Sequence, residues 1–447
     1  MSVESGQWLL LVLALPLAGA VSLLKAQGAE SFASRTLAAL WAQTAAALGV
    51  WLTHAGKDSQ LPGVGTVSVD ALAAPMIPVL AFLHLLTLLG TAKSDVTRTG
   101  CVRVLLSSVL TPLLFCCVNG GMLIGTMALF SLLPAWDLLS GGRPARVFLL
   151  YFTPFILLLA SGWLVRQDVG QVWTVGLLLL ALKLCGGIFP LHGWMPSLFQ
   201  RASFAAASLF VLPMVEVVAT VRLVLPSAPA WMLESGSWAC MATAIYASGM
   251  AVVQADARRF FAYLSLSKTS LVMFGVLSGT LSGLTASLCL WGPVVLCLAG
   301  LGYSLRALES RFGRLSLAEH HGHYDQVPGL ALVFLVSGLG VVGFPGTVGF
   351  VPMELLISGS FQHGLWACGL LAAVALLNGV SMLRAYFAFF TGKRPATSVS
   401  LRETSRERVG IVLILVAVIF AGWFSPSVVE ARHELAEMLL APRARLP

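Results

Sequence analysis

Residues 183–222 read KLCGGIFPLHGWMPSLFQRASFAAASLFVLPMVEVVATVR, and this stretch decides the fold. An apolar run that carries Lys183 meets Phe189-Pro190, and a second apolar run that carries Glu216 follows a short connecting segment. Because proline removes a backbone donor and clashes with the preceding turn, a helix kinks or stops there. In a bilayer such a break is tolerated only where other helices or a wet cavity cover it. Charges on both sides of a break at membrane depth indicate an ion pathway.

The composition of the 447-residue chain is that of a membrane protein. Hydrophobic residues make up 58% and charged residues only 10%, whereas a soluble protein carries about 25% charged residues. The net charge of +8 does not indicate nucleic-acid binding, because the basic residues are spread over short loops. The eight cysteines lie mostly in apolar segments without a C-x-x-C pair, which favours small buried side chains over metal or disulfide chemistry. No cofactor-binding fingerprint is present in the sequence, so no cofactor is predicted.

Apolar runs of about 20 residues are long enough to cross a bilayer, and here they predict an all-α polytopic protein with fourteen spans. The seventh and twelfth runs are longer than a span needs and are interrupted. A short amphipathic helix at the external surface is expected over residues 428–441. The predicted spans cover residues 7–24, 34–53, 69–92, 101–118, 119–139, 144–166, 171–200, 203–225, 229–252, 260–280, 283–305, 328–358, 363–390 and 408–427.

The positive charges of the loops predict the orientation. The loops after odd-numbered spans carry eighteen lysines and arginines, whereas the termini and the loops after even-numbered spans carry six. Because cytoplasmic loops are enriched in basic residues, the odd loops are expected in the cytoplasm and both termini on the external side.

Two similar breaks indicate an internal repeat. Pro190 follows Phe189 in the seventh span, Pro345 follows Phe344 in the twelfth, and five spans separate them. An odd offset inverts one unit relative to the other, and paired interrupted helices point to a site at mid-membrane. We therefore expect two inverted five-helix repeats. The chain then divides into helices 1–3 (1–100), a first repeat of helices 4–8 (101–225), a second repeat of helices 9–13 (229–390), and helix 14 with a short tail (391–447).

Several histidines allow more than one interpretation. His320, His321 and His323 lie in the loop 306–328. Their spacing is compatible with a metal site, but a solvated cytoplasmic loop is the favoured interpretation. His84 in the third span is interpreted as a hydrogen-bonded packing residue rather than a proton relay.

Four stretches look familiar: LKLCGGIFPLHGWMP (182–196), DARRFFAYLSLSKTSLVMFG (256–275), GLGVVGFPGTVGF (338–350) and VDALAAP (69–75). They resemble, in that order, the lysine–FP–H–W–P broken helix, the aspartate–basic–AYSS signature, the second break and the start of the third span of one family. This family comprises the antiporter-like membrane subunits of bacterial respiratory complex I, energy-converting hydrogenases and Mrp-type cation/proton antiporters. The likeness covers about residues 70–390 and implies fourteen helices, two inverted repeats and external termini.

Members of that family are thought to move protons through charges on the fifth, seventh, eighth and twelfth spans. The aligned positions of this chain carry no charge; they are Leu129, Cys185, Met214 and Met353. Charged residues stand close to three of them, and a fourth stands at the polar position after AYSS: Lys183, Glu216, Glu354 and Lys268.

Two interpretations of these charges remain open. In the first, the charges have relocated and still carry ions. Two residues of helix move a side chain about 3 Å along the axis and about 200° around it, and a lysine stem compensates for part of that. In the second, Glu216 neutralises Lys183 or Lys268 as a structural pair, because an unpaired charge at the bilayer centre costs about 3 kcal/mol or more.

Two further polar residues each allow two interpretations of their role. His192 lies in the first break and serves either as a proton relay or as a structural residue. Arg384 in the thirteenth span either extends to the cytoplasmic interface or pairs with Glu354.

The sequence therefore predicts a proton- or cation-translocating membrane subunit of a multi-subunit complex in the bacterial inner membrane. The chain itself shows no catalytic site, so an enzyme activity would belong to the complex. Its expected partners are other membrane and peripheral subunits, the lipid bilayer, and protons or small cations. The alternatives are the membrane subunit of a proton-driven bicarbonate-uptake module and a scaffold that has lost conduction, which Leu129 favours. The candidate pathway residues are Lys183, Glu216, Lys268, Glu354 and His192, with the helix breaks at Pro190 and Pro345.

Overall fold

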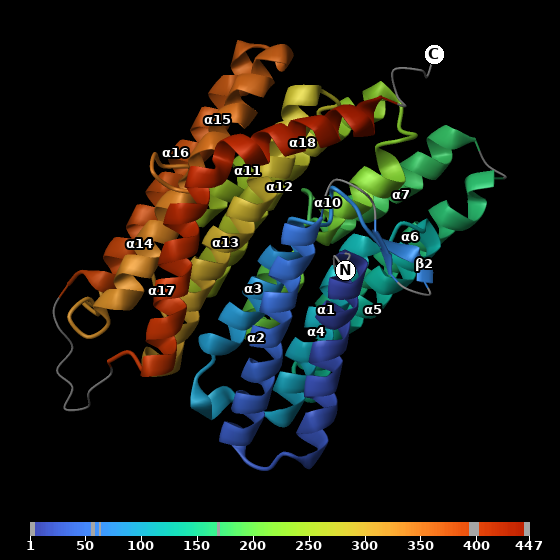
Figure 1. The fold of residues 1–447 in the computed structure, drawn as a ribbon. Helices are drawn as coiled ribbons and strands as arrows, with labels where there is room; N and C mark the ends of the chain where they lie inside the picture. Colours follow the sequence, from blue (N-terminus) through green and yellow to red (C-terminus); the bar gives the residue numbers. More distant parts are fainter. Residues whose placement is uncertain (1–4, 55–58, 62–63, 168–169, 393–401, 442–447) are drawn as a thin grey trace.

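A computed structural model describes residues 5–54, 59–61, 64–167, 170–392 and 402–441. The described part is a bundle of helices (Figure 1). Five of the charges counted for the orientation lie outside the described residues: Lys57, Lys393, Arg394, Arg443 and Arg445.

Each of the first eight predicted spans coincides with one helix or with a group of helices. These are α1 (Ser5–Ser22), α2 (Ala29–Thr53), α3 (Met76–Leu89), α4 (Arg98–Cys116), α5 (Gly120–Ser140), α6 (Arg146–Leu164), the pair α7 (Gln171–Cys185) and α8 (Trp194–Arg201), and the group α9 (Phe204–Val211), α10 (Val215–Ala219) and the π-helix η4 (Thr220–Val224).

The later predicted spans coincide with helices in the same way. These are α11 (Ala230–Val253), α12 (Ala257–Leu277), α13 (Leu281–Phe312), the pair α14 (Pro328–Val342) and α15 (Phe350–Gly359), α16 (Leu365–Phe390) and α17 (Ser405–Phe420). The amphipathic tail forms α18 (Ser425–Leu440), and short 3-10 helices cover Leu23–Lys25, Lys93–Asp95, Val165–Gln167, Ser360–His363 and Ala421–Phe424. Within the described residues, ten helical segments are long and apolar enough to cross a membrane, and α3, α7 and α14 are shorter apolar helices. The protein is a membrane protein.

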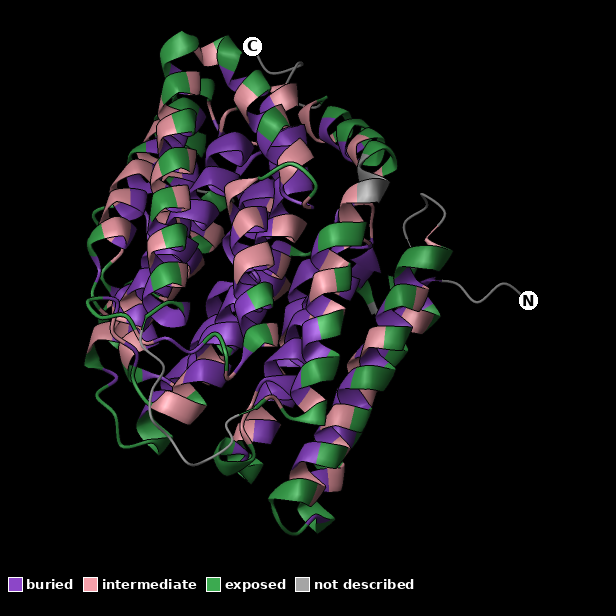
Figure 2. Cartoon of the chain, turned by 90° about the vertical axis from the view of Figure 1, so that its left-hand side faces the viewer, coloured by how far each residue is buried: buried purple, intermediate pink, exposed green. Residues whose placement is uncertain are grey.

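The core of the bundle is α12. Every residue of the most apolar part of α12 is buried, whereas only 28% of the corresponding part of α6 is. Figure 2 shows the buried residues gathered in the middle of the bundle and the exposed ones on the outer helices. The helix α18 lies across the upper end in Figure 1.

Polar side chains set where several helices begin. The side chain of Asn119 accepts hydrogen bonds from the backbone amides of Gly121 and Met122, which fixes the boundary between α4 and α5. The same role is taken at other helix starts by Thr97, Ser203, Asp256, Thr280 and Thr404.

The fold is not entirely helical, which corrects the all-α prediction at one place. Strands β1 (Ser59–Leu61) and β2 (Val64–Val69) form a small antiparallel hairpin before α3. The chain then turns, and Asp70 accepts a hydrogen bond from the backbone amide of Ala73 at 2.8 Å. The third helix therefore begins at Met76 rather than at Val69.

The first interrupted helix runs from α7 to α8, and its break is hydrogen-bonded by its own second half and by a neighbouring helix. The indole N–H of Trp194 donates to the carbonyl of Leu184 at 3.0 Å. The backbone amide of Phe189 donates to the hydroxyl of Thr243 on α11, also at 3.0 Å. Groups freed by Pro190 are thus bonded inside the protein, as a membrane environment requires.

The second interrupted helix runs from α14 to α15 and is covered in the same way. The backbone amide of Phe344 donates to the carbonyl of Leu339 at 2.9 Å. Beyond Pro345, the amide of Val348 donates to the carbonyl of Val418 on α17 at 2.9 Å. The neighbouring helix α17 therefore supplies an acceptor that the broken helix lacks.

A third break lies in the eighth predicted span, and the expectation that only two spans are interrupted is wrong. Met214 has φ +49° between α9 and α10, a left-handed conformation that is uncommon for a residue with a side chain. The indole N–H of Trp291 on α13 donates to the carbonyl of Pro213 at 3.1 Å. Pro213 is the same sequence signal that marks the other two breaks, a proline inside an apolar run.

The close packing at the second break predicts that one glycine there does not tolerate substitution. A Cβ atom added at Gly349 would overlap the backbone carbonyl oxygen of Gly340, where the two halves of the break meet. We expect Gly349→Ala to lower the thermal midpoint of the protein in detergent, because overpacking costs about 1–3 kcal/mol. Gly369→Ala on α16 is the control, since nothing lies within 4 Å of its added Cβ. Equal midpoints for the two variants would contradict this packing.

Candidate functional site

Glu216 lies against the first break. It is buried on α10, and a Cβ atom added at Gly186 would lie 3.4 Å from its Cγ. Lys183 lies in the last turn of α7, three residues before Gly186, so both charged residues belong to the same part of the bundle. The structure therefore brings Glu216 and Lys183 to one region at the α7–α8 break.

Lys268 lies across α13 from the second interrupted helix. It is 1% exposed on α12, which packs against α13, the helix that carries Cys297. The sulfur of Cys297 would in turn lie 2.5 Å from a Cβ atom added at Gly340, near the end of α14. Each interrupted helix thus has a buried charge in the helices around it.

These charges are not held in ion pairs within the described part of the chain. No carboxylate oxygen there lies within 4.0 Å of the ammonium nitrogen of Lys183 or Lys268, and Glu216 has no basic partner at that distance. The interpretation that Glu216 forms a structural pair with either lysine is therefore wrong for this structure.

The ion pairs of the protein lie elsewhere, towards the ends of the helices. Asp70 and Arg222 approach to 2.8 Å, and the guanidinium of Arg222 also donates to the carbonyl of Phe115. The sequence does not predict the contact of Asp70 with Arg222, because the two residues lie far apart along the chain. Three further pairs involving arginine are Arg103–Asp137, Arg258–Glu309 and Arg311–Glu407.

His192 lies at the edge of the bundle rather than inside it. Its Nε2 is 3.1 Å from the hydroxyl of Tyr246 on α11, and its ring stacks on Phe189. The rings of Tyr246 and Tyr263 on α12 lie edge to face, with centroids 6.4 Å apart. His192 is half-buried and Phe189 is exposed, so this cluster connects the first break with the outer surface.

Glu354 points outward, unlike the other candidate residues. It is exposed on α15, whereas the preceding Met353 is only 4% exposed. Arg384 does not pair with Glu354: its guanidinium donates to the carbonyls of Val252 and Gln254 at the end of α11. The family's fifth-span position also faces outward here, since Leu129 is 56% exposed.

Several buried polar groups on α12 and on other helices have no hydrogen-bond partner among the described residues. The amide nitrogen of Asn378 donates to the hydroxyl of Ser267, but the amide oxygen of Asn378 has no hydrogen-bond partner among the described residues. Four buried serine hydroxyls share this condition: Ser265, Ser270, Ser287 and Ser337. Such groups are normally satisfied by ordered water. The polar run SLSKTS at 265–270 inside a predicted span is the sequence signal that could have found Ser265 and Ser270.

The histidine-rich loop does not form a metal site among the described residues. The rings of His320 and His321 bond to the backbone carbonyls of Phe387 and Ser316. His323 is not solvated as expected: it stacks on Phe312 with ring centroids 3.6 Å apart, and burial lowers its pKa to about 4.

His84 and the cysteines have the packing roles that the sequence favoured. The two ring nitrogens of His84 lie 2.7 Å from the carbonyl of Leu80 and 3.0 Å from the hydroxyl of Ser107. The eight cysteines are free thiols, and seven of them are buried.

Comparison with known proteins assigns the family. Residues 147–378, more than half of the chain, match the family described as NADH:quinone oxidoreductase/Mrp antiporter, TM. The chain belongs to this family. The matched range includes all three breaks and all five candidate residues.

Curated relatives are distant and align over part of their length. The chain is 27% identical over 319 residues to subunit 13 of the NADH-quinone oxidoreductase of Thermus thermophilus, covering 70% of this chain and 67% of that protein. It is 25% identical over 287 residues to a subunit of the Na(+)/H(+) antiporter of Bacillus subtilis, covering 62% of this chain and 57% of that protein.

Solved structures share the fold over nearly the whole chain. One polypeptide of respiratory complex I from Thermus thermophilus superposes with a TM-score of 0.83 at 22% identity, covering 97% of this chain and 99% of that one. One polypeptide of the Mrp complex from Dietzia sp. superposes with a TM-score of 0.84 at 18% identity, covering 98% of both.

Glu216 has no ion pair among the described residues, whereas Glu407 accepts hydrogen bonds from two N–H groups of Arg311 at 2.8 and 2.6 Å. Mutation of each carboxylate therefore compares an unpaired buried group with a paired one. We expect Glu407→Gln to lower the thermal midpoint strongly, because breaking a buried ion pair costs about 3–5 kcal/mol. Glu216→Gln should leave the midpoint unchanged or raise it, since it removes a buried charge that has no ionic partner. A loss at Glu216 as large as that at Glu407 would identify Glu216 as a structural residue.

Proposed function

We propose that this chain is a proton- or cation-translocating membrane subunit of a multi-subunit complex. The observation that carries the proposal is the presence of buried charges without an ion pair, among the described residues, around two interrupted helices. An unpaired charge at the bilayer centre costs about 3 kcal/mol or more, so a purely structural role gives no reason to keep it. Membership of a family that contains antiporter subunits supports the proposal.

The proposed topology has fourteen spans with both termini on the external side. Each predicted span coincides with a helix or a helix group. Loops that follow the third, fifth, seventh and eleventh spans line one common cavity, as alternating crossings require. We further propose that the α7–α8 and α14–α15 breaks belong to two inverted repeats, residues 101–225 and 229–390, flanked by 1–100 and 391–447.

The proposed pathway uses Lys183 and Glu216 at the first break and Lys268 at the second. Water bonded to the buried hydroxyls around α12 would connect these groups, because protons move along hydrogen-bonded water and ionisable side chains. His192 would link the first break to the outer surface through its contact with Tyr246. Glu354 would take part only at an exposed end of the pathway, where a neighbouring subunit can cover it.

The proposed partners follow from the family rather than from a site in the chain. Relatives carry the names of NADH-quinone oxidoreductase subunits and of an antiporter subunit, so each belongs to a larger assembly. We propose the same for this chain, in a bacterial inner membrane, with the energy source supplied by its partners. A shift in a partner's charge or conformation would change the protonation of Lys183 and Glu216.

A scaffold without conduction is the second candidate, and one observation favours it. The family's fifth-span glutamate is replaced by Leu129, whose side chain faces outward. The scaffold does not account for the buried charges at the breaks, so translocation is preferred.

The test is proton flux after co-purification of the chain with its native subunits and reconstitution into liposomes. We expect Lys183→Ala and Glu216→Gln each to lower flux by roughly tenfold or more, because removal of a proton-transfer group typically costs at least that. The matched control is Glu234→Gln, which changes an exposed carboxylate on α11. Full flux in the Lys183→Ala, Glu216→Gln double variant would contradict the pathway. Failure of both single variants to assemble would instead support the scaffold.

A further inference from the structure

A large cavity opens at one end of the bundle, away from the candidate pathway. Its volume is about 880 Å³, and its walls come from the ends of α3, α4, α5, α9, α12 and α13. The loop residues Ser94, Thr97 and Thr99 at its rim are exposed, whereas Phe130 and Phe210 are buried and stack at 5.1 Å. The cavity therefore combines a polar, exposed mouth with an aromatic floor.

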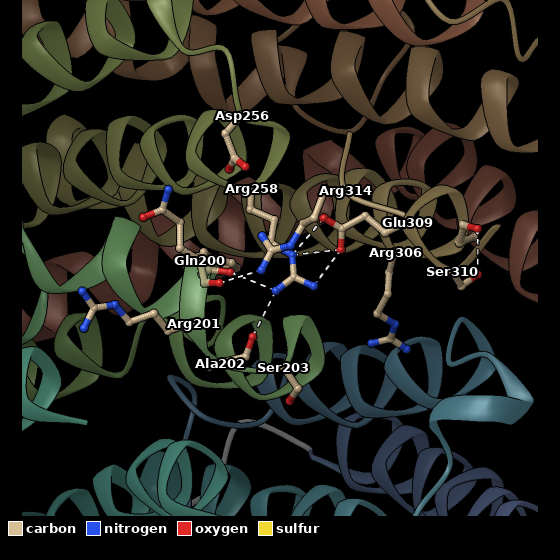
Figure 3. Close-up of polar contacts among 12 residues, drawn as sticks. Gln200, Arg201, Ala202, Ser203, Asp256, Arg258, Arg306, Glu309, Ser310 and Arg314 are labelled. Carbon is tan, nitrogen blue, oxygen red and sulfur yellow. Dashed lines mark hydrogen bonds and ion pairs between the residues drawn. The ribbon is translucent and has the colours of Figure 1, made fainter. Parts of the chain in front are cut away.

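Arginines gather at the mouth because α8 ends there. The last carbonyls of a helix have no partner within the helix. Arg258 donates to the carbonyls of Phe199 and Ala202, Arg314 to that of Gln200 and Arg143 to that of Arg201. Figure 3 shows Arg258 between Glu309 and the chain around Ala202.

Three of the cavity arginines have unused donors and no acidic partner. Arg143, Arg306 and Arg314 have no carboxylate oxygen within 4.0 Å among the described residues. A guanidinium has five N–H donors, and the bonds seen here use one of Arg143, two of Arg306 and one of Arg314. In Figure 3 the guanidinium of Arg306 points away from Glu309.

The charge of the cavity favours an anion. Its walls carry five arginines and three carboxylates, Asp95, Asp137 and Glu309, so positive charge is in excess. Such a mouth attracts anions and repels cations, which makes it a poor entrance for protons or sodium. Guanidinium groups bind phosphate through paired N–H donors.

The position of the mouth favours a lipid over a free ion. Trp136 on α5 is exposed, and the guanidinium of Arg103 lies 5.7 Å from its ring. Exposed tryptophans and arginines mark the level of the lipid headgroups. Basic pockets between helices at the cytoplasmic surface bind anionic headgroups, and the aromatic floor suits part of an acyl chain.

We propose that this cavity binds an anionic phospholipid, with the phosphate at Arg143, Arg306 and Arg314 and an acyl chain against Phe130 and Phe210. The site is separate from the proposed pathway and does not depend on ion translocation. It would attach one lipid at the junction of the first and second halves of the chain, since α4, α5 and α9 face α13 across the cavity.

The test is native mass spectrometry of the delipidated full chain in detergent, titrated with phosphatidylglycerol or phosphatidylcholine. We expect the unchanged protein to bind phosphatidylglycerol in preference to phosphatidylcholine. The Arg143→Gln, Arg314→Gln double variant should bind phosphatidylglycerol with an affinity more than tenfold lower, because each arginine removed costs roughly fivefold. These two arginines are exposed, so the variant should fold. Arg146→Gln, an exposed arginine nearby that does not line the cavity, is the control and should bind as the unchanged protein does.

Three results would overturn the proposal. The first is equal binding of the two lipids to the unchanged protein. The second is equal binding of phosphatidylglycerol by the double variant and the Arg146→Gln control. The third is full displacement of phosphatidylglycerol by millimolar inorganic phosphate, which would assign the site to a free ion.

Discussion

The fold depends on finding hydrogen-bond partners for backbone groups where helices are broken inside the membrane. A bilayer offers no water for these groups, and each unsatisfied one costs several kcal/mol. Trp194, Thr243 and Trp291 supply bonds at the breaks of the seventh and eighth spans, and the carbonyl of Val418 accepts one at the break of the twelfth. The surrounding helices are therefore needed both to cover the breaks and to bond them.

Two groups of charges in the protein differ in their partners. The first group consists of charges near the helix ends that form ion pairs and hold helices together, as Asp70 and Arg222 do at 2.8 Å. Charges around the breaks have no ionic partner among the described residues, and Lys268 is among the largest fully buried side chains. A pair stabilises one structure, whereas an unpaired ionisable group in a wet interior can change its protonation. We propose that the second group is the one that moves ions.

Local signals predict much of the fold, and long-range contacts could not be predicted. Proline inside an apolar run coincides with a break at Pro190 and Pro345, as expected, and also at Pro213, where no break was expected. The signal does not suffice alone, because Pro112, Pro134 and Pro293 lie inside continuous helices. The side that a residue faces is harder to predict, because adjacent helical residues point about 100° apart; for this reason buried Met353 and exposed Glu354 could not be told apart. The bond between Arg384 and the end of α11 joins segments more than a hundred residues apart, which one sequence does not reveal.

Protonation of Glu216 is the central claim, and infrared difference spectroscopy of the assembled complex measures it directly. Spectra of the resting and turning-over complex are compared for the unchanged protein and for Glu216→Gln. The account predicts a carboxyl signal that appears on turnover and is absent from the variant. The same carboxyl signal in both proteins would show that Glu216 keeps its protonation state, which would contradict the account.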